Sequence, residues 1–202
     1  MQLVWDEEYY AMTEAICRKR ANYVLRFFLF IGLVAAAAFF IFRPADSDAA
    51  LQTGARAPNF VTTGAIAGKS FTLDLSKQLK KGPVVLYFFP KAFTKGCTLE
   101  TQAFADNHDA FAAAGATVIG MSADDIGTLQ RFSTEACRSK FPVAVATPAI
   151  ITAYDVKMPA VNMTNRTSFV IGRDGRIKYV HSDMNYIDHV KNTLAAVRRI
   201  SR

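Results

Sequence analysis

The feature that most constrains the fold is a short apolar run that leads directly into a helical pattern. The run, residues 83–89 (PVVLYFF), is rich in valine and aromatic residues, which is typical of a buried strand. Residues 98–114 then repeat apolar side chains such as Phe104 at roughly helical spacing, with acidic side chains such as Glu100 elsewhere on the surface. Cys97 therefore lies within the first turn of the predicted helix. Free backbone N–H groups and the positive end of the helix dipole stabilise a thiolate there, so this cysteine is a candidate nucleophile.

Three residues around this turn have a distinctive spacing: Pro90, Thr94 and Cys97 read Pro-x-x-x-Thr-x-x-Cys. The spacing resembles the active-site motif of the peroxiredoxins, the alkyl hydroperoxide reductase/thiol-specific antioxidant superfamily. The flanking YFFPK and GCTLE resemble the peroxiredoxin Q, or bacterioferritin comigratory protein, subfamily. A second stretch, RTSFVI from Arg166 followed by GRDGRI, lies where that family would have it. A cysteine buried only for packing would not account for Pro90, Thr94 and Arg166 together.

The resemblance implies a thioredoxin-like α/β fold with an N-terminal β-hairpin extension. It also implies a thiol-dependent peroxidase that reduces hydrogen peroxide and organic hydroperoxides in antioxidant defence and cell redox homeostasis. In that mechanism Cys97 is the peroxidatic nucleophile and becomes a sulfenic acid. Arg166 would favour the thiolate and donate hydrogen bonds to the peroxide. Thr94 would contact the substrate, Pro90 would shield the thiolate from water, and Glu100 would orient Arg166.

A second thiol must remove the sulfenic acid. Many peroxiredoxin Q proteins carry a resolving cysteine five residues after the nucleophile, and Gln102 occupies that position here. Cys137, near the end of the next expected helix, is the remaining candidate, and its cationic neighbours Arg138 and Lys140 would favour its thiolate. Alternatively Cys137 is a structural free thiol, an external thiol acts, and the enzyme is of the one-Cys type. We expect a thioredoxin-like or other dithiol reductant, with no cofactor and no metal.

Three other classes of protein fit the sequence less well. A membrane-tethered thiol–disulfide oxidoreductase needs Cys-x-x-Cys, and the residue three before Cys97 is Thr94. A copper-delivery protein needs Cys-x-x-x-Cys, and position 101 is threonine. A non-enzymatic thioredoxin-fold binding module would have no need of Thr94 and Arg166. Consumption of hydrogen peroxide by the purified protein would separate such a module from the enzyme.

An uninterrupted apolar run occupies residues 27–42, in a part of the chain that the resemblance, beginning near Gly54, leaves unexplained. Extended back to residue 23, the run reaches about the 17–25 residues that a membrane span needs. Basic residues are denser just before the run than after it, which predicts a cytoplasmic N-terminus and an extracytoplasmic, periplasmic domain. The rival interpretations are a cleaved signal peptide and a buried core helix. We favour an uncleaved anchor because the segment before the run is long for a signal peptide.

The predicted organisation has four parts: a juxtamembrane segment 1–22, a transmembrane anchor or signal sequence 23–43, a linker 44–55 and a thioredoxin-like peroxiredoxin domain 56–202. Cys17 falls in the first part and is expected to be a free thiol on the reducing side of the membrane.

The formal net charge is +7, from 24 Lys and Arg against 17 Asp and Glu. The excess falls beyond residue 46, where the basic residues are scattered, so we expect a solvated basic surface and no nucleic-acid partner. The isolated histidines are expected on the surface or on a helix face: His108, His181 and His189. We expect a monomer or a weak homodimer.

Within the domain the pattern predicts a series of short elements. In chain order they are a β-hairpin over 57–75, a basic turn over 77–82, the strand 83–89, the helix 98–114, a strand over 116–122, a helix capped by Asp124 and Asp125 that reaches Cys137, an extended piece over 141–146, a helix opened by Thr147 and Pro148, a hairpin of strands 167–171 and 176–181, and a helix over 185–200 with Ile187, Val190, Leu194 and Val197 on one face.

Overall fold

The computed structural model describes residues 51–201. The predicted juxtamembrane segment, the anchor or signal sequence and most of the linker lie outside the described residues. Among the helices of residues 51–201, none combines the length and the apolar composition that a membrane span requires.

A seven-stranded mixed sheet forms the centre of the domain, in the order β2-β1-β5-β4-β3-β6-β7. Strand β3 lies in the interior of the sheet and pairs in parallel with β4 and antiparallel with β6. The strands are β1 (Val61–Ile66), β2 (Lys69–Asp74), β3 (Val84–Phe88), β4 (Thr117–Ser122), β5 (Val143–Val145), β6 (Thr167–Ile171) and β7 (Ile177–Ser182). The apolar run 83–89 is thus the buried strand that its composition predicts.

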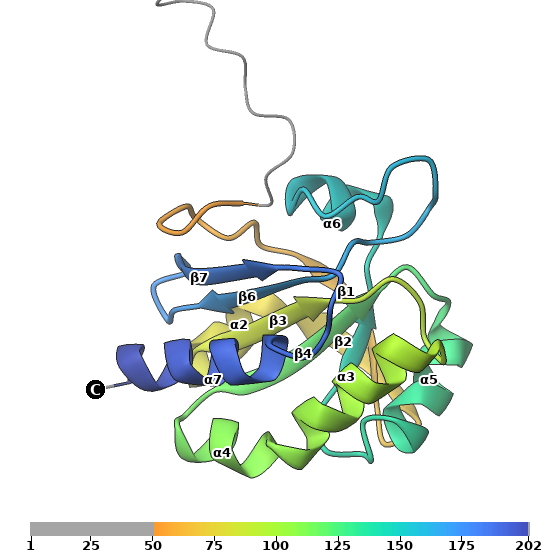
Figure 1. Ribbon diagram of the computed structural model, residues 1–202, viewed down its shortest axis with the longest axis horizontal. Helices are drawn as coiled ribbons and strands as arrows, with labels where there is room; N and C mark the ends of the chain where they lie inside the picture. The colour runs from red at the N-terminus through yellow and green to blue at the C-terminus, as the bar shows by residue number, and fades with distance from the viewer. Residues whose placement is uncertain (1–50, 202) are drawn as a thin grey trace, which may run out of the picture. The chain divides into compact units, whose positions relative to one another are not determined.

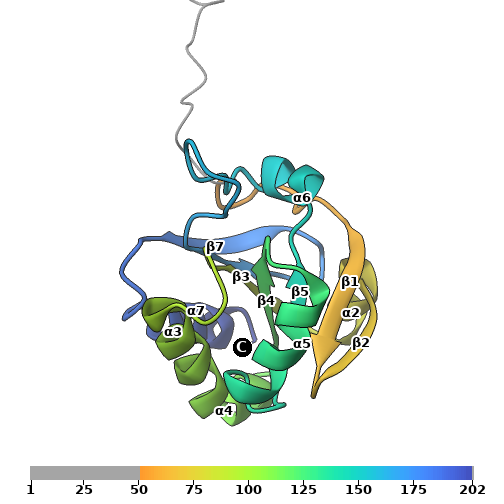
Figure 2. The ribbon, with the colours of Figure 1, turned by 90° about the vertical axis from the view of Figure 1, so that its right-hand side faces the viewer.

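Helices cover both faces of the sheet (Figures 1 and 2). Side chains alternate along β3, so Val85 and Tyr87 join one hydrophobic cluster while Leu86 and Phe88 join the other. The first cluster is closed by α3 (Lys95–Asp106), α4 (His108–Ala113), α5 (Ile126–Glu135) and α7 (His189–Ile200), and the second by α2 (Leu75–Lys81) and α6 (Pro148–Ala153). Cys97, in the first turn of α3, therefore lies on the four-helix face of the sheet.

Several predicted elements are confirmed, together with the turn and capping residues that predicted them. The N-terminal hairpin is β1 and β2, joined by a turn at Gly68, which has φ +77°. Asp125 caps α5 by accepting a hydrogen bond from the Thr128 N–H, and Thr147 caps α6 in the same way with Pro148 at the first position.

Other predictions are wrong. Residues 77–81 of the predicted basic turn belong instead to α2, which Asp74 caps and which buries only two of its residues, and Gly82 is the C-cap of this helix. The single helix expected over 98–114 is two helices, because the Asn107 side chain bonds the Ala103 carbonyl at the break. Ile187 is exposed and precedes α7, which begins at His189.

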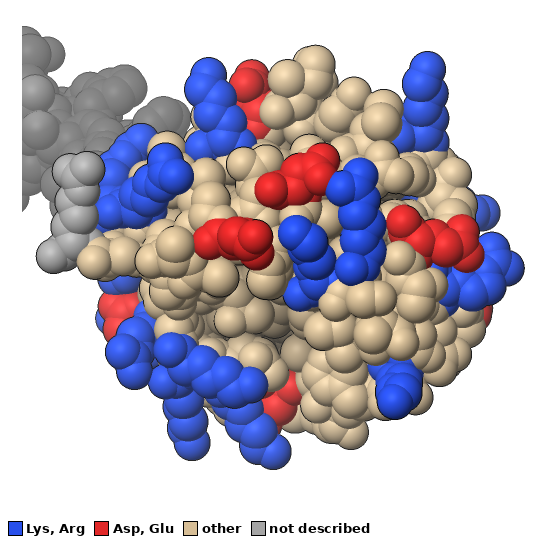
Figure 3. All heavy atoms as spheres, turned by 90° about the horizontal axis from the view of Figure 1, so that it is seen from below, with Lys and Arg blue, Asp and Glu red and all other residues tan. Residues whose placement is uncertain are grey.

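Charged side chains are mixed on the face seen in Figure 3. Lys and Arg form several separate groups there, with Asp and Glu among them and uncharged surface between. The exposed ion pairs on the domain are of ordinary kinds, for example Lys178 with Asp174 and Arg131 with Glu135. Such pairs contribute about 0–1 kcal/mol each, so they do not organise the fold.

Candidate active site

The loop that precedes Cys97 is tied to the end of β4. The Ala92 N–H donates to Asp124 Oδ2 at 2.7 Å, and the Ser122 hydroxyl donates to the same oxygen at 2.6 Å. Of the two residues predicted to cap α5, only Asp125 does so, whereas Asp124 holds the loop. The start of α3 is thus anchored to the centre of the sheet.

Phe93, in the same loop, has a left-handed backbone conformation with φ 64°. This is uncommon for a bulky residue and costs about 1–3 kcal/mol, so contacts elsewhere must hold it. Its ring packs edge-on against the Phe132 ring, with 5.1 Å between the two ring centres. The Arg131 guanidinium carbon lies 4.9 Å from the centre of the Phe93 ring. Helix α5 therefore braces the active-site loop from the side.

Thr94 stands at the N-cap of α3 but does not cap it. Its hydroxyl donates instead to the Lys91 carbonyl at 2.9 Å, and the side chain makes no hydrogen bond to the helix. The side chain is exposed, whereas Pro90 is half-buried. The lone pairs of the Thr94 oxygen and the N–H groups of the first turn are thereby left for a ligand at the helix N-terminus.

Cys97 and Arg166 meet in the interior. The Cys97 side chain is 1% exposed, and Arg166 Nη2 lies 3.4 Å from its Sγ. The other terminal nitrogen of Arg166 donates to Glu100 Oε2, one helical turn after the cysteine. The sequence motif thus predicts the three side chains that the fold brings together.

Arg166 reaches this place because it precedes β6, the antiparallel neighbour of β3. Its Nε donates to the Met184 carbonyl at 3.0 Å, which fixes the plane of the guanidinium. The nearby Thr164 hydroxyl donates to the Phe89 carbonyl at 2.8 Å and ties the approach to β6 to the end of β3. The guanidinium is therefore oriented by three contacts, with the Met184 carbonyl, Glu100 and Cys97.

Glu100 is fully buried, so its expected surface position is wrong while its expected contact with Arg166 is right. Burial raises the pKa of Glu100 to about 8, although the Arg166 guanidinium acts to lower it. Its second oxygen, Oε1, is buried and has no hydrogen-bond partner.

His189, expected to be a surface or helix-face residue, is instead buried at the start of α7 beside this site. Its Nδ1 lies 3.6 Å from Glu100 Oε1 and 2.8 Å from the Ser168 hydroxyl, and its Nε2 lies 2.9 Å from the Asp183 carbonyl. No local sequence signal marks this residue, since only the packing of α7 on β6 brings it to Glu100. Among residues 51–201, no group of acidic, histidine and cysteine side chains is arranged to hold a metal ion.

Comparison with known proteins shows the family of this chain. The model of the AhpC/TSA family matches residues 53–180, which is more than half of the chain. The chain belongs to this family. A peroxiredoxin Q of Triticum aestivum chloroplasts is 30% identical over 185 residues, 85% of this chain and 82% of the relative. This identity and coverage show that the chain is a peroxiredoxin, a thiol-dependent peroxidase.

Solved structures agree. The crystal structure of peroxidoxin BcpB from Mycobacterium tuberculosis superposes with a TM-score of 0.68 at 30% identity, covering 74% of this chain and 98% of that one. A 2-Cys peroxiredoxin of Plasmodium vivax superposes with a TM-score of 0.66 at 23% identity, which shows the fold alone.

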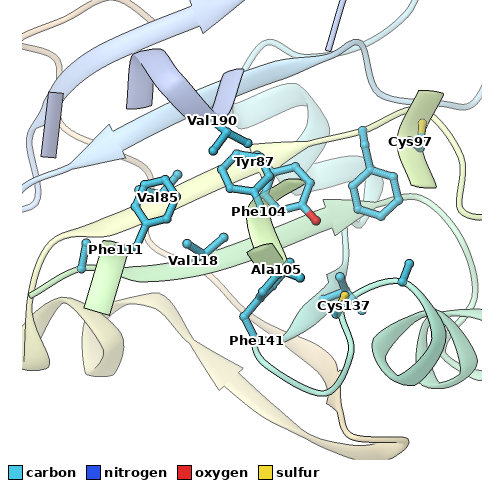
Figure 4. Close-up of a cluster of buried hydrophobic side chains, with 14 of the residues drawn as sticks. Val85, Tyr87, Cys97, Phe104, Ala105, Phe111, Val118, Cys137, Phe141 and Val190 are labelled. Carbon is cyan, nitrogen blue, oxygen red and sulfur yellow. The ribbon is translucent and has the colours of Figure 1, made fainter. Parts of the chain in front are cut away.

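The second cysteine of this peroxiredoxin domain, Cys137, is fully buried in the turn that follows α5. Cys137 and Cys97 are both free thiols in one hydrophobic cluster, and Figure 4 shows them at separate places within it. Burial raises the pKa of the Cys137 thiol, and its neighbour Arg138 is paired with Asp106. The expectation that adjacent cations favour its thiolate is therefore wrong for this conformation.

Proposed function

We propose that this peroxiredoxin reduces hydrogen peroxide and organic hydroperoxides with Cys97 as the peroxidatic thiolate. One observation supports this most directly: a buried sulfur lies 3.4 Å from a guanidinium nitrogen within the first turn of a helix. An always-cationic donor and a helix N-terminus both favour a thiolate, which is the nucleophilic form of cysteine. Its place would be in antioxidant defence and cell redox homeostasis.

In the first step the Cys97 thiolate attacks one oxygen of the peroxide. A sulfur–oxygen bond forms, the oxygen–oxygen bond breaks, and the distal oxygen leaves as hydroxide or alkoxide, which takes a proton from solvent. Sulfur is oxidised by two electrons and becomes a sulfenic acid, while the peroxide is reduced. Arg166 and the Cys97 N–H are placed to stabilise charge on the oxygens, and the Thr94 oxygen is free to accept the peroxide hydrogen.

In the second step, we propose, Cys137 resolves the sulfenic acid. Its sulfur bonds to Cys97 Sγ, the hydroxyl leaves as water, and a thioredoxin-like or other dithiol then reduces the disulfide to two thiols. In the described part of the chain Cys137 is the sole other cysteine. Because both thiols are buried at separate places, the step needs local opening of the turn after α5.

The location and assembly of the enzyme are proposals as well. We propose a single-pass anchor at residues 23–43 with the N-terminus in the cytoplasm and the catalytic domain on the extracytoplasmic side. The apolar run 27–42 and the basic residues before it support this topology. We propose that the enzyme is a monomer or a weak homodimer.

The decisive test is peroxide turnover by full-length protein with a dithiol donor. Wild-type protein should consume hydrogen peroxide, and Cys97→Ser should abolish turnover while Cys137→Ser still completes the first, single-turnover step. Full turnover by the Cys97→Ser protein would refute the assignment of the nucleophile. Absence of turnover in the wild type would favour a thioredoxin-fold binding module.

A further inference from the structure

A hydrogen bond fastens the turn between β1 and β2 to helix α5. The Gly68 N–H donates to the Ser133 hydroxyl oxygen at 2.9 Å, and that hydroxyl donates to the Gln130 carbonyl at 2.7 Å. Ser133 is fully buried, so its hydroxyl exchanges these partners for water only when the structure opens. A bond of this kind changes an opening equilibrium by about two- to tenfold.

The turn that contains Cys137 is attached to the same end of α5. The Cys137 N–H donates to the Phe132 carbonyl at 3.1 Å, and the Ser139 N–H donates to the Ser133 carbonyl at 2.9 Å. Cys137 is fully buried, and a disulfide with Cys97 needs Cα atoms within about 7 Å of each other. Movement of Cys137 toward Cys97 therefore requires the end of α5 to unwind. Ser133 joins the hairpin to the segment that must unwind.

The end of α5 also holds the loop that precedes Cys97. The centre of the Phe132 ring lies 5.1 Å from that of Phe93 in this loop and 5.4 Å from that of Phe89 at the end of β3. When the end of α5 opens, the loop loses this brace at the same time as Cys137 leaves its buried position. One opening event thus loosens the surroundings of both thiols.

We propose that the β1–β2 turn is a latch on resolution: the Gly68–Ser133 hydrogen bond limits how often the end of α5 opens, and so how fast Cys137 reaches the Cys97 sulfenic acid. The inference rests on the proposed functions of the two cysteines. Two reactions compete for the sulfenic acid. Attack by the Cys137 sulfur forms the disulfide and releases water, whereas a second peroxide molecule transfers one oxygen to the Cys97 sulfur, giving sulfinic acid and water or an alcohol. The latch sets the ratio of these two products.

Two variants open the latch from its two sides, and each has a matched control. Ser133→Ala removes the acceptor of the Gly68 N–H, while α5 keeps a good helix former. Its control is Thr134→Ala, because the exposed Thr134 hydroxyl makes the same kind of bond within α5, to the Arg131 carbonyl at 2.7 Å. Gly68→Ala strains the turn, since Gly68 has φ +77°. Its control is Gly175→Ala, where φ is +72° in the turn between β6 and β7.

The readouts on full-length protein are the rate of disulfide formation after one equivalent of hydrogen peroxide and the fraction of sulfinic acid at excess peroxide, both by peptide mapping. We expect Ser133→Ala and Gly68→Ala to form the disulfide about two- to tenfold faster and to give less sulfinic acid. The second-order rate of the first step should not change, because the closed structure carries it out. Both controls should match the wild type. Disulfide formation at the wild-type rate in both latch variants would overturn the proposal.

Alkylation of Cys137 tests the latch without any peroxide chemistry. In full-length Cys97→Ser protein, iodoacetamide reaches the buried Cys137 thiol only through opening, so its rate at the Cys137 peptide measures the opening equilibrium. Addition of Ser133→Ala should raise this rate about two- to tenfold, and addition of Thr134→Ala should not. Equal rates would overturn the proposal. A free Cys137 thiol in peroxide-treated wild type would instead refute the proposed resolution step, and the alkylation rates would still decide whether the turn restrains α5.

Discussion

At the scale of single residues, Arg166 is the side chain on which the geometry of the site depends. Its three nitrogens divide their contacts among the Cys97 sulfur, Glu100 and the Met184 carbonyl. We expect Arg166→Met to slow peroxide reduction by about a hundredfold or more, because the donor to the peroxide oxygens is lost.

Arg166→Lys is the matched variant. It keeps the charge, but one ammonium group cannot make all three contacts, so its rate should fall between those of wild type and Arg166→Met. The measurement is the second-order rate constant with hydrogen peroxide. An Arg166→Met protein as fast as the wild type would show that this cation does not assist the chemistry.

The lowered pKa of His189 predicts how the free energy of unfolding depends on pH. Its pKa is lowered in the folded state from 6.5 to about 4, so its contribution to stability is fully present above about pH 6.5 and is lost as the pH falls through 4. Compared with His189→Asn, which does not titrate, the wild type should lose about 3 kcal/mol of unfolding free energy over this window. Urea unfolding at several pH values measures the difference. A constant difference would show that His189 is not buried in its neutral form.

At the scale of secondary-structure elements, the turn between α5 and β5 is the part that must move for resolution. Arg138 and Ser139 within it have left-handed backbone conformations, with φ 50° and 60°. Such backbone conformations cost about 1–3 kcal/mol each. Opening the turn relieves this strain, which offsets part of the free energy needed to open it. The Arg138–Asp106 ion pair, which links the turn to α3, is exposed and holds it weakly.

We therefore predict an intramolecular Cys97–Cys137 disulfide in peroxide-treated protein, detected by peptide mapping. In Cys137→Ser the sulfenic acid should persist and proceed to sulfinic acid at lower doses of peroxide. A map of oxidised wild-type protein in which Cys137 remains a free thiol would support the one-Cys alternative.

The elements show where sequence patterns are sufficient and where they are not. A continuous apolar run predicts β3, and turn residues predict the hairpins, since each signal is local and strong. Helix α2 is missed because it is short, highly charged and buries only Leu75 and Leu79. The break after α3 is missed because apolar residues continue in helical spacing past Asn107, whose side chain decides the outcome.

At the scale of the whole molecule, the site combines residues from α3, the start of β6 and α7. The resemblance to peroxiredoxins predicts that Cys97, Arg166 and Glu100 act together, although Arg166 is far from the other two in the sequence. It does not predict His189, because only the antiparallel pairing of β3 with β6, and the packing of α7 on the same face, place that ring against Glu100. Burial of Glu100 and Cys137, and hence their raised pKa values, likewise depends on the assembled core.

The remaining prediction concerns the first part of the chain. Because residues 27–42 are uninterrupted apolar residues, full-length protein should resist carbonate extraction, and a C-terminal tag should be accessible from the extracytoplasmic side. Leu33→Lys combined with Val34→Lys should release the protein, since each lysine at the centre of a span costs about 2.5–3.5 kcal/mol, whereas Leu33→Ile should not. A soluble mature form that begins near Ala50 would establish a cleaved signal peptide instead. Carbonate-extractable wild-type protein of full length would exclude both the anchor and cleavage, and would place the catalytic domain on the same side of the membrane as Cys17.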